Sequence, residues 1–323
     1  MGRRAPPRRW SEMKTLREAC ASGEFLLTAE CVPPKGSDIS RFSEQGQRLL
    51  GKVHAVNVND NPAAIMHASP LALSKVLLEM GHDPICQITG RDRNRLAIQS
   101  DLLGLQILGI RNVLCLRGDD VTVGNQKETK PVFDLASVGI LKTVTDLNQG
   151  RDLGGHPLEG ATDLFAGAAV SPLSDFSGPG LIQFKNKVEA GARFLQTQAV
   201  FDPEPFKQFM EMARQSSVKV IAGVLFLRSV KMAEYVNAHI PGIRVPDHFI
   251  ERLARAGKEG AVAAGIDITL EVITSVRGLC DGVHLMAIGA EEQIPTILER
   301  AGLTDSGKGF LGGADRAVAG GSR

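Results

Sequence analysis

Short apolar stretches recur along the chain, and most are apolar at nearly every position instead of at every second one. This pattern is typical of parallel strands that are covered on both faces. Segments with helical spacing of apolar residues separate most of these stretches. Eight strands are predicted, at residues 25–32, 53–59, 84–89, 112–119, 164–171, 194–201, 218–226 and 282–289.

The predicted helices end where glycines follow them. Residues 94–108 place apolar side chains among polar ones and stop at Gly109, and residues 181–190 stop at Gly191. A glycine just after the last turn suits the left-handed conformation in which many helices end. Further helices are expected at residues 134–147, 205–213, 230–238, 247–256 and 258–277.

Eight strand–helix units in a chain of 323 residues predict an α/β protein with a single (β/α)8 TIM barrel. An open, doubly wound sheet is the alternative, but no G-x-G-x-x-G motif follows a strand. We expect the barrel at residues 14–303, a disordered leader at residues 1–13, and a disordered glycine-rich tail at residues 304–323.

Composition and charge exclude several classes of protein. The chain is 43% hydrophobic and 23% charged, which is ordinary for a globular protein. Its net charge of +1 provides no field that would attract nucleic acid or an anionic membrane. No apolar stretch follows the arginines of the first nine residues, and no run of ~18 apolar residues occurs, so neither a signal peptide nor a membrane span is predicted. We expect a cytoplasmic protein.

Cysteine and histidine usage argues against disulfides and metal sites. The five cysteines are widely spaced and never form a C-x-x-C pair, so most are interpreted as core residues. The seven histidines are scattered, and no strand end has ligands at convincing metal spacing. A catalytic metal is therefore not expected.

Candidate chemistry lies at the C-terminal ends of the strands, where barrels of this kind have their active sites. Glu30 is a lone carboxylate within an apolar run, and burying it without a partner would be costly. It either faces outward, pairs with a buried Lys or Arg, or serves as a carboxylic acid that donates a proton. Asn59, at the end of the second strand, could hydrogen-bond a ring system or simply make a turn.

The third and fourth strands end in further polar groups. Gln87 and Thr89 belong to a donor-rich segment that could bind a ligand or cap the next helix. Gly118 would allow a ligand to approach the backbone closely, while Arg117 and Asp119 offer a cation and an anion. An ordinary turn with a solvated ion pair is the alternative there.

On the sixth strand, Gln196 and Gln198 share one face, and they could reach the barrel mouth or form a polar interior. Together, the strand ends indicate a polar ligand site with one or two buried carboxylates and an organic cofactor.

Three motifs resemble those of the methylenetetrahydrofolate reductase family. Residues 30–34 (Glu-Cys-Val-Pro-Pro) resemble its Glu-x-x-Pro-Pro opening, and residues 116–119 (Leu-Arg-Gly-Asp) resemble its strand-four motif. Residues 187–192 and 196–202 resemble its Lys-Val-x-Ala-Gly-Ala and Thr-Gln-x-x-Phe-Asp block. The three motifs occur in the family's order, and the resemblance runs from about residue 16 to residue 303.

The resemblance implies a flavoprotein that interconverts 5,10-methylenetetrahydrofolate and 5-methyltetrahydrofolate by hydride transfer from reduced flavin. It implies that Glu30 donates the proton that opens the folate's imidazolidine ring, that Asp119 stabilises the resulting cation, and that Gln198 binds the pterin. The cofactor would be FAD, with FMN as the alternative. The expected cofactor contacts are Asn59, Gln87, Thr89, Arg117, Gly118, Asp119 and Lys187.

The chain departs from the family where a nicotinamide or an adenine would bind. Residues 59–60 (Asn-Asp) and Gln87 replace a Thr-Tyr pair and a His, and residues 169–172 lack a Tyr-Pro-Glu element. Gly180 and Asn186 replace an acidic and a basic residue. These departures resemble a divergent bacterial branch whose catalytic flavoprotein subunit can take electrons from a partner protein. Direct use of NADH or NADPH is left open, and a homo- or hetero-oligomer is expected.

Two other functions remain as alternatives. One is a partner-dependent flavin- and folate-binding subunit of a larger redox complex, without direct use of NAD(P)H. The other is a different flavin barrel with an unrelated substrate, which the Glu-x-x-Pro-Pro and Thr-Gln motifs disfavour.

Overall fold

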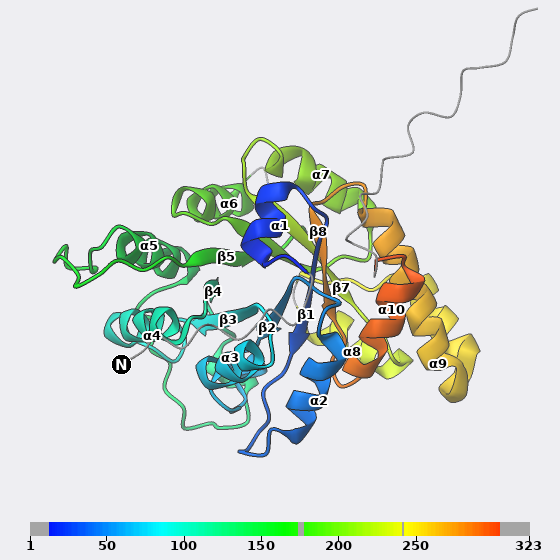
Figure 1. Ribbon diagram of the computed structural model, residues 1–323. Coiled ribbons are helices and arrows are strands. Elements are labelled where there is room, and N and C mark those ends of the chain that lie inside the picture. The colour runs from blue at the N-terminus through cyan, green and yellow to red at the C-terminus, as the bar shows by residue number, and fades with distance from the viewer. Residues whose placement is uncertain (1–12, 174–177, 241, 304–323) are drawn as a thin grey trace, which may run out of the picture.

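Eight parallel strands close into a barrel in the computed structural model, which describes residues 13–173, 178–240 and 242–303. Each strand pairs with its neighbours in sequence, and β1 closes the barrel against β8 (Figure 1). All eight predicted strands and the (β/α)8 fold are confirmed. The strands are β1 (Leu26–Cys31), β2 (Ala55–Val58), β3 (Pro84–Thr89), β4 (Asn112–Leu116), β5 (Phe165–Val170), β6 (Phe194–Ala199), β7 (Lys219–Leu225) and β8 (Gly282–Met286).

A ring of helices surrounds the strands (Figure 1). The described residues form α1 (Leu16–Ser22), α2 (Ser40–Leu49), α3 (Pro70–Glu79), α4 (Arg95–Leu108), α5 (Ser137–Asn148), α6 (Pro179–Glu189), α7 (Pro203–Ala213), α8 (Val230–His239), α9 (Asp247–Val276) and α10 (Ile294–Arg300). All the predicted helices are found, whereas α1, α2, α3 and α10 were not predicted. Gly257, with φ 64° and ψ −174°, interrupts α9 between the two helices expected there.

Local sequence signals explain how α4 begins and how α4 and α6 end. The side chain of Asn94 accepts hydrogen bonds from the backbone N–H groups of Leu96 and Ala97, which caps the start of α4. Gly109 ends α4 at φ 85°, and Gly191 follows α6 at φ 104°. Both glycines therefore have the left-handed conformation that their positions predict.

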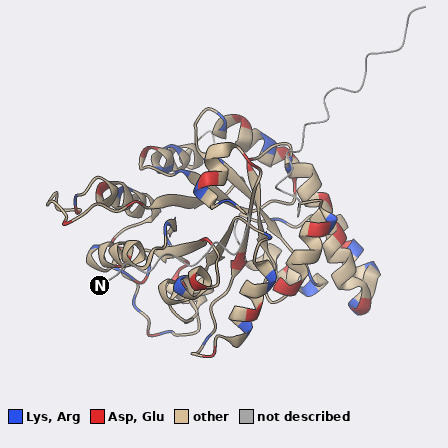
Figure 2. Cartoon of the chain, viewed as in Figure 1, with Lys and Arg blue, Asp and Glu red and all other residues tan. Residues whose placement is uncertain are grey.

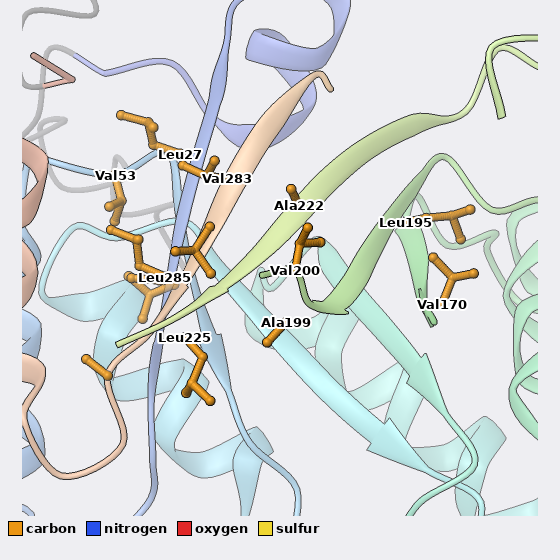
Figure 3. Close-up of a cluster of buried hydrophobic side chains, with 14 of the residues drawn as sticks. Leu27, Val53, Val170, Leu195, Ala199, Val200, Ala222, Leu225, Val283 and Leu285 are labelled. Atoms are coloured by element: carbon orange, nitrogen blue, oxygen red, sulfur yellow. The ribbon is translucent and has the colours of Figure 1, made fainter. Parts of the chain in front are cut away.

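The main core lies between the barrel wall and the helices. Outward-facing side chains such as Leu27, Val283 and Leu285 are buried in this layer (Figure 3). Cys86 and Cys115 belong to the same core, and burial raises the pKa of the Cys86 thiol to about 12. These cysteines behave as small hydrophobic residues, as expected.

The barrel interior changes from apolar to polar along the strands. Its N-terminal part is a separate apolar cluster, onto which Leu16 and Ala19 of α1 pack like a plug. That cluster consists of Leu26, Ala55, Ile85, Leu114, Phe194 and Ile221 together with the two plug residues. Two residues further along β1, β2, β6 and β8, the same inward face presents polar side chains, namely Thr28, Asn57, Gln196 and His284.

Two long polar loops interrupt the alternation of strands and helices. The loop at residues 120–131 contains the short 3₁₀ helix η2 (Val121–Val123), which packs against η1 (Pro62–Ala64) after β2. The loop at residues 149–162 makes an antiparallel bridge between Arg151 and Pro157. The expected tail and all of the expected leader except Met13 lie outside the described residues.

Charged residues of both signs are distributed over the outer helices (Figure 2). Among the helices in the described ranges, none combines the length and apolar character needed to cross a bilayer.

The plug formed by α1 can be tested with one substitution. Leu16 is 0% exposed, so Leu16→Ala leaves a cavity beneath the barrel and should lower the free energy of unfolding by about 2–5 kcal/mol. The matched control Leu96→Ala lies on α4 with 74% of its surface exposed and should change stability by less than about 0.5 kcal/mol. Urea unfolding followed by circular dichroism measures both. Equal effects would mean that α1 does not seal the barrel.

Candidate active site

Glu30 lies inside the barrel near its C-terminal end and is 8% exposed. Its Oε2 atom accepts a hydrogen bond from Asn59 Nδ2 at 3.1 Å, and His284 Nε2 lies 3.7 Å from the same oxygen. Glu30 therefore neither faces outward nor makes an ion pair with a Lys or Arg of the described residues. Its neighbours are the amide of Asn59 and the imidazole of His284.

Asn59 faces Glu30 with only one end of its amide. Its Nδ2 donates to Glu30, whereas its Oδ1 is buried without a hydrogen-bond donor among the described residues. A buried acceptor without a partner is costly in a folded protein. A ligand that supplies an N–H or O–H group would satisfy it.

A polar layer lies one level below Glu30 in the barrel. Asn57 and Gln196 exchange two hydrogen bonds between their amides, at 2.7 and 3.1 Å. Gln196 Nε2 also lies 3.4 Å from Thr28 Oγ1, which is 2.9 Å from His284 Nδ1. Gln196 therefore belongs to the polar interior, one of the two positions that the sequence left open.

The ends of β2 and β3 are joined by a buried carboxylate. Asp60 accepts hydrogen bonds from the backbone N–H of Thr89 at 2.9 Å, from its hydroxyl at 2.8 Å and from Arg93 Nη1 at 2.6 Å. Arg93 also bonds Asp101 at 2.8 Å. The Thr89 hydroxyl, expected to contact a cofactor, is thus committed to Asp60. Gln87 is buried on the same strand, with 8% of its surface exposed.

At the end of β4, close packing explains why residue 118 is a glycine. Gly118 has φ 88°, and a Cβ atom there would lie 2.9 Å from Arg91 Cβ and 3.1 Å from Thr89 Cβ. The chain therefore needs glycine for its own packing, whether or not a ligand approaches. Arg117 stacks over the ring of Phe133 at 4.3 Å instead of forming the solvated ion pair considered from the sequence.

The neighbouring carboxylates of Asp119 and Asp120 have different partners. Asp119 Oδ2 accepts a hydrogen bond from the backbone N–H of Ala63 in η1 at 2.9 Å. Ala63 has φ 53°, a left-handed conformation that strains a residue other than glycine. Asp120 caps η2 by accepting two hydrogen bonds from Thr122, which hold the pKa of Asp120 below its usual value. Asp119 thus faces the loop after β2, whereas Asp120 belongs to the loop after β4.

A cavity of about 520 Å³ opens beside the ends of β5 and β6 and is lined in part by α6. Its polar side chains are those of Gln198, Lys187, Gln183 and Ser171. Lys187 Nζ donates to the backbone oxygen of Ala169 at 2.8 Å, and burial lowers the pKa of Lys187. This half-buried ammonium has no carboxylate partner among the described residues. It could therefore bind an anionic or carbonyl oxygen of a ligand.

The expected site residues thus form three groups around the mouth. The β1–β3 group contains Glu30, Asn59, Gln87 and Thr89; the β4 group contains Arg117, Gly118 and Asp119; and the β6–α6 group contains Gln198 and Lys187. Within the described part of the chain, no group of three or more His, Cys, Asp or Glu side chains is arranged to hold a metal ion.

Sequence reasoning missed His284 and the Asp60–Arg93 pair. In the sequence, His284 was one of seven scattered histidines, and Thr28, two positions before Glu30, was not considered as a site residue. A usable signal was present. On two neighbouring strands, polar residues occur two positions apart, as in Thr28 and Glu30 or Asn57 and Asn59, and such residues face the same side of a strand.

Comparison with known proteins identifies the family. Residues 15–302 match the family described as "Methylenetetrahydrofolate reductase". The chain belongs to this family. The (β/α)8 fold and the three sequence motifs agree with that membership.

Two curated relatives illustrate the similarity. "5,10-methylenetetrahydrofolate reductase" of Salmonella typhimurium is 31% identical over 233 residues, covering 68% of this chain and 72% of the relative. "Methylenetetrahydrofolate reductase 2" of Schizosaccharomyces pombe is 25% identical over 309 residues, covering 87% of this chain and 46% of the relative. The chain spans less than half the length of this and other eukaryotic family members.

A solved structure shares the fold. It is described as an uncharacterized protein from Clostridium thermocellum that binds two copies of 5-methyl-5,6,7,8-tetrahydrofolic acid. Its TM-score is 0.64 at 15% identity, over 90% of this chain and 98% of that protein.

Proposed function

We propose that this chain is a flavin-dependent methylenetetrahydrofolate reductase that interconverts 5,10-methylenetetrahydrofolate and 5-methyltetrahydrofolate. The main support is Glu30, a buried carboxyl group at the barrel mouth whose neighbours are the amide of Asn59 and the imidazole of His284. A carboxyl group at this position is within the barrel mouth, where it could act as a general acid toward a bound substrate. Family membership supports the same reaction.

The residues at the mouth fit a flavin. Its ring system carries both N–H and carbonyl groups, which match the unsatisfied Oδ1 of Asn59 and the ammonium of Lys187. The cavity of about 520 Å³ is within the usual range for cofactor sites. We propose FAD as the cofactor, with FMN as the alternative. Its proposed contacts are Asn59, Gln87, Thr89, Arg117, Gly118, Asp119 and Lys187.

The chain's own residues would perform the proton chemistry. Glu30 gives its proton to N10 of the folate as the bond between N10 and the methylene carbon breaks, and the electron pair of that bond takes up the proton. The methylene carbon then forms a cation with N5, which the carboxylate of Asp119 stabilises. Reduced flavin, when bound, supplies the hydride that converts this carbon to a methyl group. Gln198 hydrogen-bonds the pterin, and Glu30 regains a proton from solvent.

The residues at the ends of β2 and β3 are relevant to the identity of the electron donor. Asp60 is occupied by Thr89 and Arg93, and Gln87 is buried beside them, where nicotinamide-using family members tend to have other residues. This arrangement favours a second candidate function, a catalytic subunit that takes electrons from a partner protein and not directly from NADH or NADPH.

The proposed cofactor and electron donor can be tested by absorbance spectroscopy. Protein reconstituted with FAD or FMN should retain flavin after desalting, and retention of neither would contradict the proposal. Bleaching of the flavin by 5-methyltetrahydrofolate but not by NADH would indicate the partner-dependent enzyme. Bleaching by NADH would indicate a self-sufficient reductase, and bleaching by neither would support a binding subunit.

Substitution of Glu30 separates the two half-reactions. Glu30→Gln keeps the shape and hydrogen-bonding capacity of the side chain but cannot donate the proton that opens the ring. Oxidation of reduced flavin by methylenetetrahydrofolate should slow by at least about 10²-fold, the usual effect of losing a general acid. Reduction of the flavin by its own donor should change little. Equal damage to both half-reactions would make Glu30 a structural residue.

The two adjacent aspartates provide a matched pair of variants. Asp119→Asn should slow hydride transfer to the folate and raise the flavin's reduction potential, because a nearby anion disfavours the anionic reduced flavin. Asp120→Asn should have much smaller effects on both, since Asp120 caps η2. Stopped-flow reoxidation and dye-equilibration potentials measure the two quantities. A larger effect of Asp120→Asn would show that the assignment at the end of β4 is displaced by one residue.

A further inference from the structure

A chain of hydrogen bonds runs beneath Glu30, from Asn57 through Gln196 and Thr28 to His284. The donor and acceptor of each bond can be assigned in turn, starting from Asn57. Asn57 Nδ2 donates to Gln196 Oε1 at 2.7 Å, and Gln196 Nε2 donates back to Asn57 Oδ1 at 3.1 Å. The remaining N–H of Gln196 faces Thr28 Oγ1 at 3.4 Å. Thr28 Oγ1 therefore accepts from Gln196, and its own proton is available for another partner.

That partner is His284. Its Nδ1 atom lies 2.9 Å from Thr28 Oγ1, within hydrogen-bond distance. If the Thr28 hydroxyl donates to Nδ1, the single proton of a neutral imidazole must be on Nε2. The hydrogen-bond chain thus selects one of the two tautomers of His284.

The Nε2 atom faces Glu30. It lies 3.7 Å from Oε2, the oxygen that also accepts the hydrogen bond from Asn59 Nδ2 at 3.1 Å. In this tautomer, the hydrogen bond from Asn59 and the N–H of His284, which is near but beyond hydrogen-bond distance, are both on the side of Oε2. The opposite tautomer would place a nitrogen lone pair against this oxygen, which already acts as an acceptor. The arrangement leaves Oε1 as the oxygen that can carry a proton.

We propose that His284 is a positioning residue for the acid Glu30. Thr28 keeps the proton of His284 on Nε2. The hydrogen bond from Asn59 Nδ2 and the nearby Nε2–H of His284, 3.7 Å away, both favour Oε2 as the acceptor oxygen, so that the transferable proton is on Oε1. After the proton has left, the same two donors stabilise the carboxylate. This role rests on the proposed function, whereas the tautomer itself does not.

Nitrogen-15 NMR of the histidine rings tests the tautomer directly in the full-length protein. The ring shifts distinguish a proton on Nε2 from one on Nδ1, and the signals missing from His284→Asn assign the residue. The wild-type protein should show His284 with its proton on Nε2. Thr28→Val, which removes the hydroxyl, should give a mixture of tautomers, and Thr28→Ser, which retains it, should restore the wild-type signals. A proton on Nδ1 in the wild type, or unchanged signals in Thr28→Val, would overturn the proposal.

Stopped-flow kinetics test the consequence for Glu30. Thr28→Val should slow oxidation of the flavin by methylenetetrahydrofolate about five- to tenfold, as expected for one lost hydrogen bond, and Thr28→Ser should restore the rate. The matched control is Thr269→Val, because Thr269 is also buried but bonds only Gly265 within α9. An unchanged rate with a changed tautomer would overturn the positioning role. Wild-type protein that never reacts with the folate but keeps the Nε2 proton would overturn the proposed function and leave the tautomer standing.

Discussion

A buried carboxyl group with no Lys or Arg partner among the described residues is the constraint on which the site depends. Glu30 lies inside the barrel, where an ionised carboxylate loses most of its hydration, and its neighbours compensate with N–H groups instead of charge. Those neighbours need partners of their own, which explains the polar layer of Thr28, Asn57, Gln196 and His284 below the mouth. The apolar cluster sealed by α1 then closes the barrel beneath that layer. The interior is thus graded so that polarity increases toward the end where chemistry is proposed.

Much of the fold follows from short-range patterns, and the helices that were not predicted show where such patterns fail. The strands were predictable because walls covered on both faces are apolar at nearly every position. Helix α1 has only seven residues, too few to establish a period. Helix α2 does have helical periodicity, because Phe42, Gln45, Gly46 and Leu49 are buried at the spacing of one helix face, but only two of these four are large apolar residues. In α1, tertiary packing and not local periodicity determines the helix.

The site was only partly predictable, because its residues meet through closure of the barrel. Glu30 and Asn59 could be proposed from their positions at strand ends, yet their mutual hydrogen bond depends on the pairing of neighbouring strands. His284 reaches Glu30 only because β8 pairs with β1 at the other end of the chain. The Asp60–Arg93 pair similarly joins the ends of two strands. The sequence motifs indicate the candidate site residues, whereas closure of the barrel determines which side chains contact them.

The mouth also has two unequal sides, and this asymmetry bears on the proposed reaction. On β2 and β3, the polar groups of Asp60, Thr89 and Arg93 largely satisfy one another, so they form a rigid wall. On β6 and α6, Gln198 and Lys187 line an open cavity, and within the described residues the ammonium of Lys187 bonds a backbone oxygen but no carboxylate. A ligand therefore gains most from the open side, where its oxygens would meet donors that are not already committed. Glu30 lies on β1 and accepts a hydrogen bond from Asn59 at the end of β2, so the proposed proton donor lies next to this wall and not beside the open cavity.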